Sequence, residues 1–188
     1  MARTSTSRRS GGPAFCNSTD LDDVRLRRMC LDAVAGYRLD GATVRVRYSR
    51  GADFSGSCYY RPPCIFVNLG RHLVYPYAMA TNLARARSNA RCWWRPIYTI
   101  ELADPYQVVL FVFLHECFHL LVKRARRNTR QKESMCDRFA ARILVDHYGA
   151  AVRGAHHHFV SRDDWDFQDI EGFIAAARPS RPKPAVRV

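Results

Sequence analysis

The chain has 188 residues, of which 47% are hydrophobic and 12% aromatic, so it can bury one core but is too short for us to expect two domains. This composition excludes an intrinsically disordered protein. Lys and Arg outnumber Asp and Glu by 30 to 17, a formal net charge of +13, which raises the prospect of a polyanionic partner without identifying one.

The first part of the chain predicts a tail, a helix and a strand. Residues 1–16 are rich in Ser, Arg and Gly and are expected to be a disordered basic tail. Thr19 or Asp20 can cap a helix whose apolar residues recur up to Gly36. Residues 42–49 alternate apolar and polar side chains, which predicts a half-buried strand.

The middle of the chain predicts mainly β-structure. Residues 57–60 and 64–69 are expected to pair as the two strands of a hairpin. Residues 71–96 are ambiguous, and a helical stretch can be placed at 78–90. A short strand at 97–102 is expected to follow.

The strongest helix prediction comes next. Asp104 is a natural N-cap, and Pro105 suits the first helical position. Residues 106–125 are apolar on nearly all sides, which predicts a helix buried in the core. The most apolar part, 108–122, has 15 residues, whereas crossing a bilayer takes roughly 18 to 20, so no membrane segment is predicted.

The last part of the chain predicts two further helices and a tail. One helix covers residues 129–148 and stops at Gly149, and another covers 161–177. The Pro- and Arg-rich residues 178–188 are expected to be a disordered tail. A single globular domain is therefore expected over residues 17–177.

Cysteine usage indicates a reducing compartment. The seven cysteines form no CxxC pair and their number is odd, which argues for reduced thiols and against a disulfide framework. Residues 1–15 carry charge with no apolar segment behind it, unlike a secretory signal. We therefore expect a soluble, cytoplasmic protein.

The candidate chemistry begins with an H-E-x-x-H motif, His115-Glu116-Cys117-Phe118-His119, inside the apolar helix. Four residues advance a helix by about 400°, so both imidazoles project from one face and can chelate one zinc ion. Glu116 lies beside that face, where it can act as general base on an activated water. The alternative is two core histidines with a glutamate held by an arginine.

A catalytic zinc also needs a third protein ligand. Glu133 and Asp137 share a face of the following helix, so Glu133 can bind the ion while Asp137 accepts the spare N–H of His115 or His119. Both acids could instead lie on a solvated face, paired with neighbouring basic residues. The rival third ligands are Asp137 itself, His147 and the run 156–158.

These motifs resemble the ImmA/IrrE-type zinc metallopeptidases, which are gluzincins. In that family H-E-x-x-H is followed by a helix reading roughly E-x-x-A-[ND]-x-F-A-x-x-L-L, and here ESMCDRFAARIL follows. The resemblance covers residues 109–144 and departs from the family at Cys136, where Ala is usual, and after Leu144, where Met-Pro is missing. It implies zinc-dependent hydrolysis of a peptide bond in a protein or peptide substrate.

The same resemblance implies an α+β, minimal zincin-like fold. A small, mainly antiparallel sheet is expected to pack on the buried H-E-x-x-H helix and on a second helix that bears a ligand. Residues 64–69 are the candidate edge strand for extended substrate, with an ordinary hairpin strand as the alternative. That candidate strand comprises Cys64, Ile65, Phe66, Val67, Asn68 and Leu69.

Two features remain open. The oxyanion of peptide hydrolysis needs a stabilising donor, for which Tyr148, His147 and His157 are candidates. A basic loop after the apolar helix could dock nucleic acid or an acidic protein, or be a solvated loop without a partner. The basic residues of this loop are Lys123, Arg124, Arg126, Arg127, Arg130 and Lys132.

Other functions compete with that of a peptidase. SprT-like DNA-associated proteases share the motif and a basic surface but use a third histidine, and no histidine lies between 119 and 147. A non-catalytic zincin-fold binding or regulatory module would not need the carboxylate of Glu116. A purely structural zinc site would need a fourth ligand, for which His147 and Cys136 are available.

Overall fold

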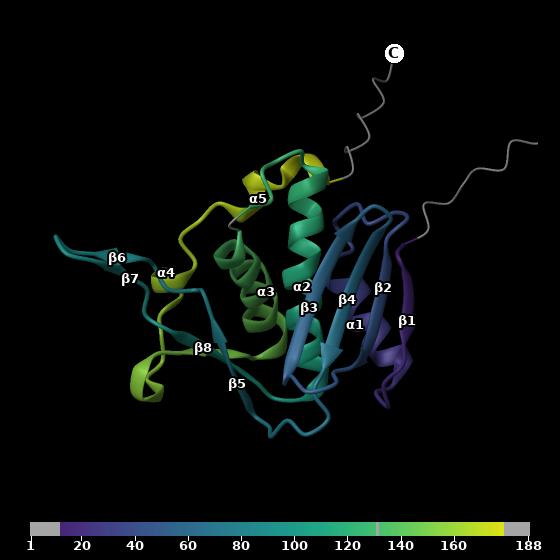
Figure 1. The fold of residues 1–188 in the computed structure, drawn as a ribbon, viewed down its shortest axis with the longest axis horizontal. Helices are drawn as coiled ribbons and strands as arrows, with labels where there is room; N and C mark the ends of the chain where they lie inside the picture. The colour runs from purple at the N-terminus through teal and green to yellow at the C-terminus, as the bar shows by residue number, and fades with distance from the viewer. Residues whose placement is uncertain (1–11, 131, 179–188) are drawn as a thin grey trace, which may run out of the picture.

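A computed structural model describes residues 12–130 and 132–178 (Figure 1). Most of the two expected tails therefore lies outside the described residues. The expected N-terminal tail is nevertheless too long, because residues 14–17 form a strand that pairs with the strand at 43–48. Four residues are too few to show a period in the sequence, so only the partner strand reveals this one.

The N-terminal half folds into a mixed four-stranded sheet of order β1-β2-β4-β3. Its elements are β1 (Ala14–Asn17), α1 (Asp23–Ala33), β2 (Thr43–Tyr48), β3 (Phe54–Tyr60) and β4 (Pro63–Leu69). The strand predicted at 42–49 and the hairpin are confirmed, while the first helix starts later than expected, after Asp22. The Asp22 carboxylate caps this helix by accepting from the Arg25 N–H at 2.6 Å.

The order of strands corrects two expectations. Strand β2 pairs in parallel with both β1 and β4, so the sheet is not mainly antiparallel; helix α1 provides the crossover between β1 and β2. Strand β4 is interior, with β2 on one side and β3 on the other. Residues 64–69 therefore do not form an edge strand, and the edge strands of this sheet are β1 and β3.

Residues 77–102 form antiparallel β-structure, so the helix placed at 78–90 is wrong. Strand β8 lies between β5 and β9 in a second sheet, and β6 and β7 form a separate two-stranded hairpin. Pairing of β5 with β8 buries Met79 and Thr81, a tertiary contact that overrides the helical preference of the alanines. The bounds are β5 (Tyr77–Thr81), β6 (Arg87–Ser88), β7 (Trp93–Trp94), β8 (Tyr98–Leu102) and β9 (Ala151–Arg153).

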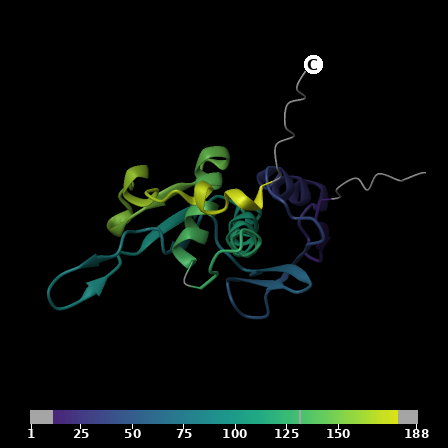
Figure 2. The ribbon, with the colours of Figure 1, turned by 90° about the horizontal axis from the view of Figure 1, so that it is seen from above.

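Two helices occupy the centre of the molecule. Helix α2 (Pro105–Arg124) lies between the four-stranded sheet and α3 (Glu133–Tyr148), as Figures 1 and 2 show. The predicted cap of α2 is confirmed, since Asp104 accepts from the Gln107 N–H at 2.9 Å. Helix α3 starts at Glu133 instead of 129 and ends as predicted at Gly149, which has a left-handed φ of 69°.

Helix α2 is a core helix. Of the helices within the described ranges, it alone is long and apolar enough to cross a membrane by length and composition, yet 78% of its most apolar window is buried inside the fold. The other buried residues pack around it in one continuous core. The arrangement makes the protein an α+β fold.

The C-terminal segment is irregular where one helix was expected over 161–177. Its short pieces are η1 (Ala155–His157), α4 (Arg162–Trp165), α5 (Ile170–Phe173) and η2 (Ala175–Ala177). The helix is interrupted where Asp166 and Gln168 turn toward α3, because Arg142 donates to both and Arg138 donates to the Gln168 side chain. Polar contacts between its turns bind this segment to α3.

Candidate metal centre

The H-E-x-x-H motif lies in the middle of α2, on the side that faces α3. His115 and His119 are one turn apart, and their ring centroids are 5.2 Å from each other. The two imidazoles retain 17% and 14% of their side-chain exposure. Both rings can therefore reach a common point that solvent can also reach.

Glu133, the first residue of α3, completes this arrangement. Its carboxylate oxygens lie 3.1 Å from His115 Nε2 and 3.5 Å from His119 Nε2. The structure thus brings together the three side chains that sequence spacing had selected. The side chain of Glu133 is 58% exposed, so this side of the cluster is open to solvent.

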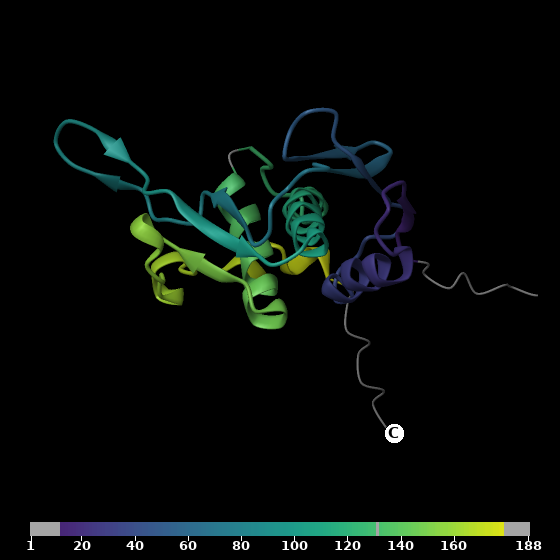
Figure 3. The ribbon, with the colours of Figure 1, turned by 90° about the horizontal axis from the view of Figure 1, so that it is seen from below.

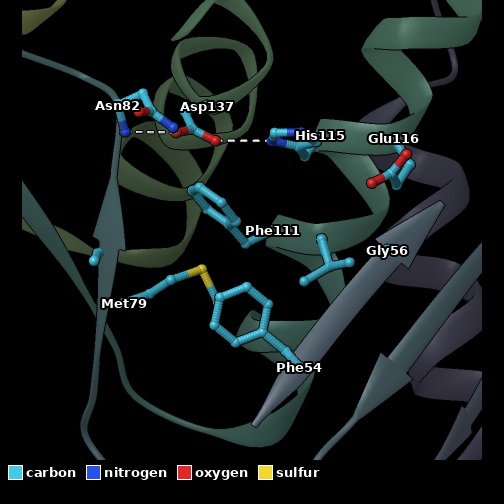
Figure 4. Close-up of a pocket in the computed structure, with 10 residues that line it drawn as sticks. Phe54, Gly56, Met79, Asn82, Phe111, His115, Glu116 and Asp137 are labelled. Atoms are coloured by element: carbon cyan, nitrogen blue, oxygen red, sulfur yellow. Dashed lines mark hydrogen bonds and ion pairs between the residues drawn. The ribbon is translucent and has the colours of Figure 1, made fainter. Parts of the chain in front are cut away.

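Asp137 lies one turn further along α3 and holds His115. One carboxylate oxygen is 2.7 Å from His115 Nδ1, and the other accepts from the backbone N–H of Asn82 at 2.6 Å (Figure 4). Because Asp137 can accept at Nδ1, the tautomer with its free electron pair on Nε2 is favoured. Asp137 therefore takes the orienting position and leaves Nε2 facing His119 and Glu133.

Cys136 is a further donor at the same place. Its Sγ is 3.4 Å from His119 Nε2, and one donor atom each from His115, His119 and Cys136 all lie within 4.8 Å of one another. This cluster could hold a metal ion, although the geometry alone does not identify which one. Burial strongly raises the pKa of the Cys136 thiol, so it stays protonated unless a cation faces it.

Glu116 points away from α3 into a pocket of about 220 Å³ between α2, β3 and β5 (Figure 4). Burial raises the pKa of Glu116 to about 7. The nearby His115 opposes this increase, and Glu133 adds a smaller one. A carboxyl with that pKa can both take and return a proton near neutral pH. Phe54, Met79 and Phe111 form the apolar part of the pocket beside it.

Gly56 on β3 makes room for Glu116. A Cβ added at this position would overlap the Glu116 carboxylate and come within 2.8 Å of Val112 Cγ1. The edge strand of the sheet therefore passes closer to the catalytic candidate than any residue with a side chain would allow.

Charges inside the cluster show why a cation suits it. Burial disfavours the charged form of His115, but hydrogen bonds to Asp137 and Glu133 outweigh burial and raise its pKa to about 10. Burial and the neighbouring His115 lower the pKa of His119. The hydrogen bond from His115 lowers the pKa of Glu133. The proton on His115 thus neutralises carboxylates that a bound metal ion would neutralise in its place.

The structure does not bring the predicted oxyanion donors to the centre. His147 and Tyr148 line a separate cavity with Asp32 and Ala33, at the opposite end of α3 and about 20 Å from Glu133 by helix rise. His157 is exposed in η1, beyond β9, which is on the far side of β8 from β5. His147 and Tyr148 thus lie too far along α3 from Glu133 to serve, as their spacing in the sequence already indicated, and His157 lies on a different element.

Sequence reasoning missed Asn82, which anchors Asp137 with its backbone N–H and with its side-chain Nδ2 at 3.2 Å. It lies in the segment whose structure was ambiguous, and no local signal pairs it with Asp137. The apolar residues of the pocket were missed for the same reason, since they come from three separate elements.

The basic residues at 123–132 are partly occupied by contacts within the protein. Arg124 donates to the backbone carbonyls of Arg38 and Asp40, and Lys123 lies 5.7 Å from the centre of the Tyr60 ring. Arg127 and Lys132 lie 5.8 and 5.2 Å from the Phe173 ring. Docking of nucleic acid or an acidic protein through this loop stays a prediction.

Comparison with known proteins adds no assignment: no protein-family model, curated protein or solved structure matches the chain.

Proposed function

We propose that the protein is a zinc-dependent peptidase in which His115, His119 and Glu133 hold the ion and Glu116 is the general base. The observation that carries the proposal is the position of the Glu133 carboxylate beside both Nε2 atoms. The ImmA/IrrE-like, zincin-type fold and the cytoplasmic location remain parts of the same proposal.

The spacing of the donors supports a tetrahedral ion. Bonds of about 2.0–2.1 Å to nitrogen and oxygen set neighbouring ligands about 3.3 Å apart in a tetrahedron. The two distances from Glu133 to the imidazoles, 3.1 and 3.5 Å, bracket that value. Two neutral imidazoles and one carboxylate are also a typical ligand set of a catalytic zinc site.

The chain's own groups divide the work of peptide hydrolysis. A bound zinc ion would supply a water with a pKa of about 7 and polarise the scissile carbonyl. Glu116 would take the proton of the attacking water and deliver it to the leaving amine, which its pKa of about 7 suits. Asp137 would hold the His115 ring in a fixed orientation throughout the reaction.

Strand β3 is the element that would bind extended substrate. Of the two edge strands of the four-stranded sheet, β1 and β3, it is the one whose Gly56 lies against Glu116. A peptide added to this edge would pair through main-chain hydrogen bonds and pass the catalytic carboxylate. This assignment replaces the interior strand β4.

The test compares wild type with Glu116→Gln and Glu133→Ala, and with Glu101→Gln as control. Glu101 on β8 pairs with Arg153 on β9, outside the metal cluster. Wild type and Glu101→Gln should retain about one zinc ion per chain and cleave casein. Glu116→Gln should retain zinc and lose cleavage, and Glu133→Ala should bind zinc more weakly and lose cleavage. Full activity of Glu116→Gln, or a zinc affinity unchanged by Glu133→Ala, would contradict the proposal.

A further inference from the structure

The metal cluster contains one donor more than a catalytic zinc needs. Cys136 follows Glu133 by three residues on α3, so both side chains project toward the imidazole pair. The cysteine is completely buried, whereas Glu133 is the exposed member of the cluster. The two helices therefore close on the same point with a thiol on the inner side and a carboxylate on the outer side.

The position of the thiol matches that of a ligand. With bonds of about 2.3 Å to sulfur and about 2.0–2.1 Å to nitrogen, tetrahedral geometry sets sulfur and nitrogen ligands about 3.6 Å apart. The distance from Cys136 Sγ to His119 Nε2 is 3.4 Å. This distance fits neighbouring ligands of one ion, and donor atoms of His115, His119 and Cys136 all lie within 4.8 Å of one another.

We propose that Cys136 is the fourth protein ligand of the resting metal centre, bound as a thiolate after its proton passes to solvent. The inference rests on the metal ion of the proposed function. Two imidazoles, a carboxylate and a thiolate fill a tetrahedron and leave no position for water. The thiolate must therefore leave the ion before peptide hydrolysis can begin, so each turnover of wild type would start with its displacement by water.

Cobalt(II) distinguishes this centre from one with only His115, His119 and Glu133, because thiolate bound to cobalt gives a charge-transfer absorption in the near ultraviolet. The variants are Cys136→Ala and, as control, Cys117→Ala. Cys117 is an equally buried cysteine within the H-E-x-x-H motif that lies outside the donor cluster. Circular dichroism of each variant checks that it has folded.

Wild type and Cys117→Ala should show the thiolate band at one cobalt per chain, and Cys136→Ala should bind cobalt without it. Zinc affinity measured by chelator competition should fall about tenfold or more in Cys136→Ala alone, since one bond to the ion is removed. Stoichiometric cobalt in wild type without the band would overturn the role of Cys136 and leave the peptidase proposal standing. Failure of wild type to bind cobalt or zinc would overturn both.

A separate observation concerns the hairpin of β6 and β7, which projects from the body of the molecule in all three views (Figures 1, 2 and 3). Trp93 and Trp94 on this hairpin are 70% and 42% exposed, so they do not cover the core. Residues 82–97 contain four arginines and no acidic residue. The projection is therefore both aromatic and positively charged.

The arginines of the hairpin divide into two pairs. Arg85 stacks on Phe167 at 3.9 Å from the ring centre, and Arg95 donates to the Asn82 carbonyl at 3.3 Å, so these two brace its base. Arg87 and Arg91 are exposed further out. Arg87 is directly opposite Trp94 across the two strands, which places a guanidinium beside an indole on one face.

From this pairing we infer that the hairpin binds single-stranded nucleic acid. Exposed indoles can stack on unpaired bases, and neighbouring arginines can contact the phosphates between them. A duplex would offer no free base face to the tryptophans. The charge of the hairpin is complementary to a polyanion and leaves no acidic side chain to repel it.

The test titrates labelled oligo-dT onto the full chain and follows anisotropy and tryptophan fluorescence. Trp165 is only 2% exposed, so quenching on binding reports on Trp93 and Trp94. Trp93→Ala with Trp94→Ala should abolish measurable binding at low salt. Arg87→Ala with Arg91→Ala should reduce the magnitude of the log K against log salt slope by about 1.4, because each phosphate that is no longer neutralised accounts for about 0.7.

The matched control is Arg27→Ala with Arg28→Ala, which removes two exposed arginines from α1 and should leave binding nearly unchanged. Absence of binding by wild type at low salt would overturn the inference. Binding that survives loss of both tryptophans would overturn it as well. Equal competition by polyglutamate would show charge attraction without base stacking, and so would also contradict it.

Discussion

At the scale of single residues, the cluster is organised around the proton on His115. Asp137 and Glu133 together raise the pKa of this imidazole to about 10, so the metal-free protein carries an imidazolium between two carboxylates. A divalent ion can replace that proton and keep the carboxylates neutralised. The same contacts that stabilise the imidazolium therefore become the orienting and ligating contacts of a metal centre.

Metal uptake should consequently release protons. Below the folded-state pKa of about 10, His115 is protonated and must lose its proton to bind, so its contribution should make metal affinity rise with pH up to that value, and loss of the Cys136 proton would add to the rise. The rise should be about tenfold per pH unit for each proton displaced. Calorimetry of zinc binding in buffers of different ionisation enthalpy measures the number released. Affinity that does not vary between neutral pH and pH 9 would mean that His115 is already neutral.

The contact of Gly56 with Glu116 gives a second prediction at this scale. Gly56→Ala should leave zinc bound but displace the carboxylate of Glu116, the proposed general base, because the added methyl overlaps it and Val112. A displacement of about 1 Å can reduce turnover about 100-fold. Casein cleavage and zinc content together measure this effect. Gly51→Ala is the control, since a Cβ at Gly51 meets nothing within 4 Å.

At the scale of elements, the sequence was most informative where the residues of a single helix were enough to predict that helix. Asp104, Pro105 and the continuous apolar run defined α2, and the spacing of Glu133 and Asp137 placed both carboxylates on the correct face of α3. Strand β5 and the interruption of the expected helix near Asp166 could not be derived in this way. Their structure depends on pairing with β8 and on hydrogen bonds from Arg142, which are distant in the sequence.

The C-terminal end of α3 offers a prediction that separates stability from the metal centre. Gly149 has a φ of 69°, and a Cβ there would meet nothing within 4 Å, so the cost of Gly149→Ala is that of the left-handed backbone alone. We expect the free energy of unfolding to fall by about 1 kcal/mol. Urea denaturation measures it, with Gly51→Ala as a control without positive φ. Zinc affinity should not change, because Gly149 lies at the end of α3 away from Glu133.

At the scale of the whole molecule, the candidate site exists only because separate parts of the chain converge on α2. Strand β3 brings Gly56 to one side of it, the segment after β5 brings Asn82, and α3 brings Glu133, Cys136 and Asp137. The motif alone therefore selected His115, Glu116 and His119. The supporting residues needed the tertiary structure, since no local pattern relates Asn82 to a helix that begins 51 residues later.

Arg138 is the residue that joins these parts. Its side chain is buried and donates to the carbonyls of Leu83, Ser134 and Trp165 and to the side chain of Gln168, at distances between 2.6 and 3.0 Å. It therefore connects α3 with the segment next to Asn82 and with the C-terminal turns. Removing it would leave several buried acceptors without a donor, each at a cost of about 1–3 kcal/mol.

Arg138→Met, which keeps much of the side-chain volume, should lower the free energy of unfolding by about 3 kcal/mol or more. It should also weaken zinc binding, because Leu83 is adjacent to Asn82 and Asn82 anchors the carboxylate that orients His115. Urea denaturation and chelator competition measure the two effects. Arg142→Met is the matched control. It removes a partly exposed arginine of the same helix whose hydrogen bonds, among the described residues, go to Asp166 and Gln168 in the C-terminal turns, so it should reduce stability less and leave zinc affinity unchanged. Loss of stability in Arg138→Met without any loss of zinc affinity would show that the Asn82 segment keeps its place without this link.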